Sequence, residues 1–119
     1  MAVIAGTITG TNLLFANGNR RTYEVCVDFG AYTGAADTFT IAAVGAHIKA
    51  DKRSGATHTL RSAQCIGSGF DTAAQAVFTG ACTVSTDALN GDLSDASGTE
   101  LTSSTACKGV RLAVTLDES

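Results

Sequence analysis

The stretch that decides the fold is RTYEVCVDF, residues 21–29. Apolar and polar side chains alternate along it, and a period of two is typical of a strand with one face on a hydrophobic core. The apolar face carries Tyr23, Val25, Val27 and Phe29. Residues 17–19, Asn-Gly-Asn, favour a tight turn because Asn and Gly tolerate positive φ. The sequence therefore predicts a strand that is entered from a turn.

The same alternation returns at the C-terminal end of the chain. Residues 108–116 place Val110, Leu112, Val114 and Leu116 on one face. Strand character is also present at residues 2–9, 56–66 and 74–85, and a short apolar run at 13–16 follows the first of these. Residues 86–106 are polar and are expected to form loops.

One segment changes its period. In residues 40–53, Ile41, Val44 and Ile48 recur at helical spacing, with Thr40 as a candidate N-cap and Gly55 as a stop signal. The sequence therefore predicts a mainly β chain, a small antiparallel β-sandwich or barrel-like domain with one short helix.

The composition favours one small domain over residues 1–119. Ala, Gly, Thr and Ser account for 59 residues, whereas Leu, Ile, Val and Phe account for only 26. So few bulky side chains predict a thin core, and neighbouring subunits are expected to complete it. No run approaches the 18 apolar residues of a membrane span, so no membrane partner is expected.

The charge is unevenly distributed along the chain. The formal net charge is −3, which argues against direct binding to nucleic acid. Most of the basic residues lie in the first half, and those proposed to bind a partner protein are Arg20, Arg21, Lys49, Lys52 and Arg53. The alternative is that they only keep the domain soluble.

Four cysteines are present: Cys26, Cys65, Cys82 and Cys107. Their spacing contains no CxxC and does not fit a zinc site. The first residues lack the pattern of a signal peptide, so we expect synthesis in a host cytoplasm and reduced, structural thiols. Two disulfides, with three alternative pairings, are the competing interpretation.

Candidate chemistry is sparse. His47, His58 and Cys65 are conceivable metal ligands, but surface or boundary histidines are the simpler interpretation. Residues 87–95 gather Asp87, Asp92 and Asp95 around Asn90-Gly91 without the register of an EF-hand. No G-x-S-x-G elbow or activated cysteine is apparent. We therefore expect no metal, no cofactor and no enzymatic activity.

The overall style of the chain resembles the small virion proteins of tailed bacteriophages, of the capsid decoration or cement type. Segments 2–9, 41–53 followed by 55–61, and 110–116 carry the resemblance, together with the absence of proline. It implies a protein on the capsid surface of the virion, bound to the major capsid protein and to copies of itself as a homo-oligomer on a lattice. Such proteins clamp adjacent shell subunits.

Other functional classes stay open at this point. One is another virion component, such as a head–tail joining or tail protein. Another is a bacterial surface or binding domain stabilised by disulfides, and a third is a β-sandwich that binds a small ligand or sugar. The four cysteines, which a decoration protein does not need, keep the surface domain among the alternatives.

Overall fold

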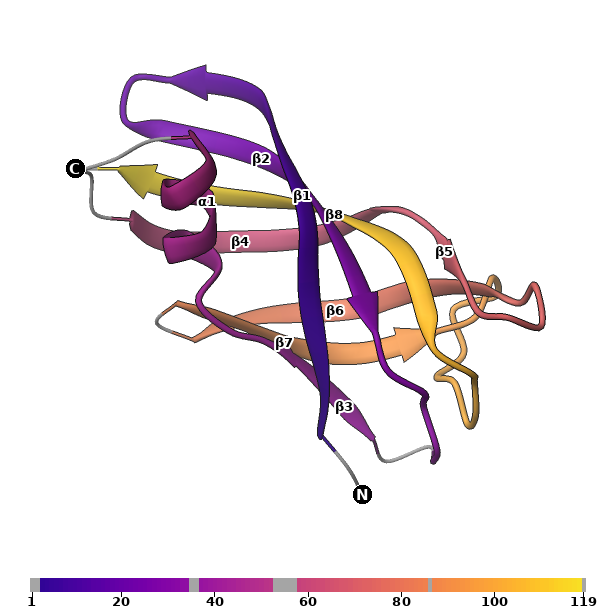
Figure 1. Cartoon of the computed structure of the whole chain (residues 1–119). Coiled ribbons are helices and arrows are strands. Elements are labelled where there is room, and N and C mark those ends of the chain that lie inside the picture. The colour runs from indigo at the N-terminus through magenta and orange to yellow at the C-terminus, as the bar shows by residue number, and fades with distance from the viewer. Residues whose placement is uncertain (1–2, 35–36, 53–57, 86, 119) are drawn as a thin grey trace.

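The computed structural model describes residues 3–34, 37–52, 58–85 and 87–118 (Figure 1). Within these ranges the side chains of residues 49–52, 58, 81 and 118 are outside the description. The elements are β1 (Val3–Asn17), β2 (Arg20–Phe29), β3 (Thr38–Ile41), α1 (Val44–Lys52), β4 (His58–Gly67), β5 (Gly69–Phe70), β6 (Ala76–Ser85), β7 (Ala88–Ser94) and β8 (Cys107–Glu118). The chain is mainly β with one short helix, as the sequence predicts.

The strands form one sheet that closes on itself. Their order is β2-β1-β3-β7-β6-β5-β8-β4, and β2 also pairs with β8, so the ladder returns to its first strand. β1 and β3 run parallel, and the other pairs are antiparallel. β4 continues into β5 and pairs with the same edge of β8. The result is the barrel-like arrangement that the alternating runs predict.

The core lies inside this closed sheet. β2 and β8 pair over most of their length, with Val25 opposite Leu112 and Val27 opposite Val110. These four side chains are fully buried, so the faces assigned from the alternation in both segments are confirmed. Phe29 packs on Phe39 of β3, with ring centroids 4.9 Å apart. A sequence lean in bulky residues thus fills a compact core.

The turn predicted from Asn-Gly-Asn joins β1 to β2. Asn17 pairs with Arg20, which leaves Gly18 and Asn19 as the two turn residues. Gly18 has φ 62°, the left-handed conformation that glycine adopts without steric cost. A two-residue turn with glycine first suits the right-handed twist of a hairpin.

The first strand is longer than predicted. β1 is continuous from Val3 to Asn17, so residues 3–9 of the first predicted segment and residues 13–16 belong to one strand, while residue 2 lies outside the described residues. Register shifts between Ile8 and Gly10 and between Leu13 and Phe15 mark β-bulges. A bulge interrupts the alternation of side chains, so the sequence pattern breaks between these segments although the strand continues.

The helix begins later than predicted, at Val44 rather than at Thr40. Residues 38–41 instead form β3, which pairs with β1 and β7. Ile41, Val44 and Ile48 are all buried, as predicted, but Ile41 is on a strand. Ala43 stands between the two elements at φ 56°. Because β3 is followed so closely by α1, the buried residues Ile41, Val44 and Ile48 fall at helical spacing in the sequence although only the last two are on the helix.

The prediction of loops throughout residues 86–106 is wrong in part. Residues 88–94 form β7, held between β3 and β6, with Leu89 and Leu93 fully buried. The polar residues Asn90-Gly91-Asp92 between the two leucines conceal the strand pattern. Among the described residues, no helix is long and apolar enough to cross a membrane.

Candidate interaction surface

An apolar patch marks the end of the β1–β2 hairpin. Leu13, Leu14 and Phe15 are consecutive, and their side chains are 42%, 45% and 60% exposed. Leu13 is opposite Tyr23 in the ladder and Phe15 is opposite Thr22, and all of residues 12–17 are exposed at this end of the hairpin. Six large apolar residues of the described chain are exposed, and half of them lie in this run. We call these three residues the hairpin patch.

A groove of about 280 Å³ lies beside the hairpin patch. Its lining comes from four strands: Leu14, Phe15, Thr22, Ser62, Ala63, Gln64, Ala113 and Thr115. In its wall, the hydroxyls of Thr22 and Thr115 share a hydrogen bond of 3.0 Å. The groove therefore combines two exposed apolar side chains with hydroxyl, amide and methyl groups. This mixture suits a protein partner, because protein interfaces place apolar anchors beside polar groups.

A charged cluster lies on β2, β4 and β8, at the same end of the molecule. Arg20 and Asp117 are opposite each other in the β2–β8 ladder, and the Arg20 Nε donates to Oδ1 of Asp117 at 2.8 Å. The Arg61 Nε donates to the other carboxylate oxygen at 2.7 Å. The hydrogen bonds from Arg20 and Arg61 lower the pKa of Asp117 to about 2. Two guanidinium groups thus converge on one carboxylate at the end of the hairpin that carries the hairpin patch.

The basic residues proposed from the sequence do not form one described surface. Arg20 joins the charged cluster, and it follows the hairpin turn immediately. Arg21 alternates to the side of β2 that carries Tyr23 and is only partly exposed. Lys49 and Lys52 belong to α1, but their side chains lie outside the described residues, and so does the whole of Arg53. Arg61, a basic residue outside these five, contacts the same carboxylate as Arg20.

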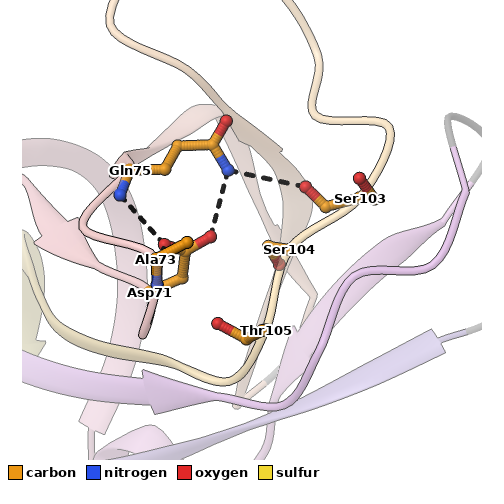
Figure 2. A pocket seen from close by; sticks show the side chains of 6 residues that line it. All are labelled: Asp71, Ala73, Gln75, Ser103, Ser104 and Thr105. Atoms are coloured by element: carbon orange, nitrogen blue, oxygen red, sulfur yellow. Dashed lines mark hydrogen bonds between the residues drawn. The ribbon is translucent and has the colours of Figure 1, made fainter.

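A second, open hollow of about 470 Å³ is lined by Asp71, Ala73, Gln75 and residues 103–105. Figure 2 shows Gln75 reaching over Asp71 toward Ser103. The Asp71 carboxylate accepts hydrogen bonds from the backbone N–H of Ala73 at 3.0 Å and of Gln75 at 2.9 Å, and from Gln75 Nε2 at 3.1 Å.

These hydrogen bonds give the Asp71 carboxylate in the hollow a structural role. Burial alone would raise the pKa of Asp71, but the hydrogen bonds from Gln75 and Ala73 together outweigh it, and the pKa is lowered. The carboxylate thus stays ionised as the fixed point of a tight turn that contains Ala74 at φ 64°. Thr72 ties the same turn to Thr105 through hydrogen bonds of 2.8 Å and 2.7 Å.

The acidic segment 87–95 is likewise used by the fold. Asp87 caps α1: its Oδ1 accepts from the Gly45 N–H at 2.6 Å, and its carbonyl accepts from Val44 at 3.1 Å. Asp95 closes a turn by accepting hydrogen bonds from Ser97 and Thr99. Over the part of the chain that the structure describes, no three His, Cys, Asp or Glu side chains gather as a metal site. The side chain of His58 is outside that part.

All four cysteines are free thiols in the structure. Cys107 is buried, and Cys26, Cys65 and Cys82 are partly buried. Burial raises the pKa of the Cys82 and Cys107 thiols.

Comparison of the chain with family models, with curated proteins and with solved structures found no match.

Proposed function

We propose that the protein is a structural virion protein that decorates and stabilises a bacteriophage capsid by binding across major capsid protein subunits. The observation that carries the proposal is the hairpin patch, three consecutive large apolar side chains exposed beside a groove. The resemblance of the whole chain to small phage virion proteins supplies the partner.

The energetics favour a partner on this surface. Full burial of a Leu or Phe side chain stabilises by about 1.5–3 kcal/mol. Because Leu13, Leu14 and Phe15 are about half exposed, covering them contributes roughly 3 kcal/mol for each copy. That is modest for one contact, but many identical contacts on a lattice bind with much greater avidity. A decoration protein has this arrangement.

The charged cluster adds orientation. The guanidinium groups of Arg20 and Arg61 are each about half exposed, so an acidic side chain on the partner could approach them. Exposed charges of this kind contribute little affinity, but they set the register of a contact and its dependence on salt. Binding to the shell should therefore weaken as the ionic strength rises.

The first experiment sediments a lysate of the source through a density gradient and quantifies this chain by mass spectrometry. Co-sedimentation with particles, at a copy number comparable to that of the shell protein, supports decoration. A few copies per particle instead indicate a portal or tail component and overturn the decoration role. Recovery at the top of the gradient as a soluble species overturns the virion role altogether.

The second experiment tests the surface itself with matched variants. Phe15→Ser removes the most exposed residue of the hairpin patch, and Phe70→Ser removes a phenylalanine that is 55% exposed on β5. Purified variants are added to particles that lack the protein, and bound copies are counted. We expect occupancy to fall at least tenfold for Phe15→Ser only. Equal occupancy of both variants would exclude the hairpin patch from the contact.

A further inference from the structure

The closed sheet has a seam between β4 and β6. The ladder passes from β6 to β8 through β5, a strand of two residues, in which Gly69 pairs with Val77 and Phe70 with Ala76. Beyond β5, β4 and β6 lie close to each other (Figure 1). The described pairings give β4 a hydrogen-bonded partner in β8 and none in β6. Side chains alone therefore hold this part of the ring together.

Cys65 and Cys82 stand on the two sides of the seam. Four residues before Gly69 is Cys65, and four residues after its partner Val77 is Ala81, so the antiparallel register directs Cys65 to the immediate neighbourhood of Cys82. Each strand also carries a register shift here, between Cys65 and Gly67 and between Thr79 and Cys82. Burial, and after it the charge of Cys65, raises the pKa of Cys82, which agrees with two neighbouring thiols.

Both thiols also face the same side. Cys65 and Cys82 are partly buried, and both pack against the hydrophobic core, as do Ala63 and Val84 on the same strands. The Cys65 Sγ donates to the Gly67 carbonyl at 3.5 Å, and the Cys82 Sγ donates to the Thr79 hydroxyl at 3.6 Å. The two thiols thus lie on the inner side of adjacent strands, where a disulfide would span the seam.

The register excludes Cys107 from a disulfide with either Cys26 or Cys65. Cys107 is opposite Phe29, which is three residues along β2 from Cys26 and so about 10 Å away. Cys65 is opposite Leu112, which is five residues from Cys107 and so about 17 Å away. A disulfide requires Cα atoms within about 7 Å.

The remaining pairs fail for similar reasons. Lys108, next to Cys107, aligns with Phe70 of β5 and through it with Ala76, and Cys82 is six residues further along β6, about 20 Å away. Cys26 alternates with Val25 and Val27, which are fully buried, so its side chain points to the outer face. The inward thiols of Cys65 and Cys82 therefore cannot reach it. One pairing of the six survives.

We propose that Cys65 and Cys82 are a latent disulfide pair that closes the seam when the protein meets a small-molecule disulfide such as oxidised glutathione. One cysteine thiolate attacks a glutathione sulfur, forms a mixed disulfide and releases one glutathione thiolate. The second cysteine thiolate then attacks the cysteine sulfur of that mixed disulfide and releases the other. Two protein thiols become one disulfide, and one oxidised glutathione becomes two reduced molecules.

The closed form is the more stable one. The new bond joins residues 17 positions apart, and a loop of this size restricts the unfolded chain substantially. For a chain of this length we expect the melting temperature to rise by about 10 °C. Formation should also accelerate with pH because the thiolate is the nucleophile and burial raises the pKa of Cys82.

The test oxidises the folded, full-length chain with oxidised glutathione, blocks the remaining thiols with an alkylating agent, and maps the cysteines by mass spectrometry. Trypsin leaves Cys65, Cys82 and Cys107 in one peptide, so a protease that cleaves before aspartate is added to cut at Asp71 and Asp87. We expect one linked pair of peptides, 62–70 with 71–86, and full alkylation of Cys26 and Cys107.

Matched variants separate the pair from the other thiols. The double variant Cys26→Ser, Cys107→Ser should keep both the link and the rise in melting temperature that dithiothreitol reverses. The variant Cys65→Ser should lose both the link and the rise in melting temperature. Because Cys65 is only partly buried, this variant should fold, and its melting temperature before oxidation gives the baseline for the comparison. A stable glutathione adduct on Cys65 or Cys82, a link that involves Cys26 or Cys107, or a link between two chains would each overturn the proposal.

Discussion

Gly69 provides the sharpest test of the closed sheet. It is the residue at which β5 crosses β8, and a Cβ atom there would lie 2.3 Å from the Lys108 carbonyl oxygen and 2.7 Å from the Val110 backbone nitrogen. Both are backbone atoms of β8, so no side-chain rotation relieves the contact. The substitution Gly69→Ala must therefore push β5 away from β8.

The expected cost follows from these contacts. Overpacking a well-filled site costs about 1–3 kcal/mol, and the displacement of β5 also removes about 1 kcal/mol of hydrogen bonding between Phe70 and Lys108. We expect Gly69→Ala to lose about 2–4 kcal/mol of unfolding free energy. For a chain of this length, that corresponds to a melting temperature about 8–16 °C lower.

Two other glycines provide the controls, measured by calorimetry in reducing buffer. A Cβ at Gly6 would lie 2.8 Å from side-chain atoms of Ile41 and Phe29, which can partly give way, so Gly6→Ala should cost about 1–3 kcal/mol. Nothing lies within 4 Å of a Cβ at Gly10, so Gly10→Ala should be neutral or slightly stabilising. If Gly69→Ala melts within 2 °C of Gly10→Ala, the sheet does not close through β5.

Two further predictions concern charged groups. Asp87→Ala should lower the free energy of unfolding by about 1 kcal/mol, because the N-terminus of α1 loses the acceptor for the Gly45 N–H. Asp87→Asn keeps an acceptor and should lose less. Equal denaturation midpoints for both variants and the wild type would contradict the capping role of Asp87. Arg20 and Arg61 lower the pKa of Asp117 from 3.8 to about 2, so this carboxylate stabilises the fold above pH 4, and its contribution should disappear as the pH falls toward 2. Asp117→Asn should flatten that part of the stability–pH curve, and an unchanged curve would show that the charged cluster does not form in solution.

The sequence predicts the central strands well because their pattern has one cause. β2 and β8 each bury one face against the core, and their apolar residues must therefore alternate without interruption. β7 escapes prediction because two buried leucines, Leu89 and Leu93, suffice for a strand that is flanked by β3 and β6. β3 escapes because four residues are too few to show a period before the helical spacing begins.

The candidate surface was harder to predict for a different reason. Residues 13–16 look like an ordinary apolar segment of a strand, but they lie at the end of the β1–β2 hairpin, where residues 12–17 are all exposed. The charged cluster joins residues that are far apart in the sequence. Arg20 contacts Asp117, which is 97 positions further along the chain, and Arg61 contacts the same carboxylate. Both relationships depend on the register between strands, which composition and periodicity do not specify.

The closed sheet also explains why the hairpin patch stays exposed in an isolated chain. The ladder between β1 and β2 continues through Leu13–Tyr23 and Phe15–Thr22 to Asn17–Arg20, so backbone hydrogen bonds fix the position of the patch. β2 is held on its other edge by β8, as far as Arg20 and Asp117. Folding the patch inward would break both ladders, at a cost greater than the roughly 3 kcal/mol that its burial contributes. Burial by a partner breaks neither ladder, and this argument supports the proposal that the hairpin patch binds another protein.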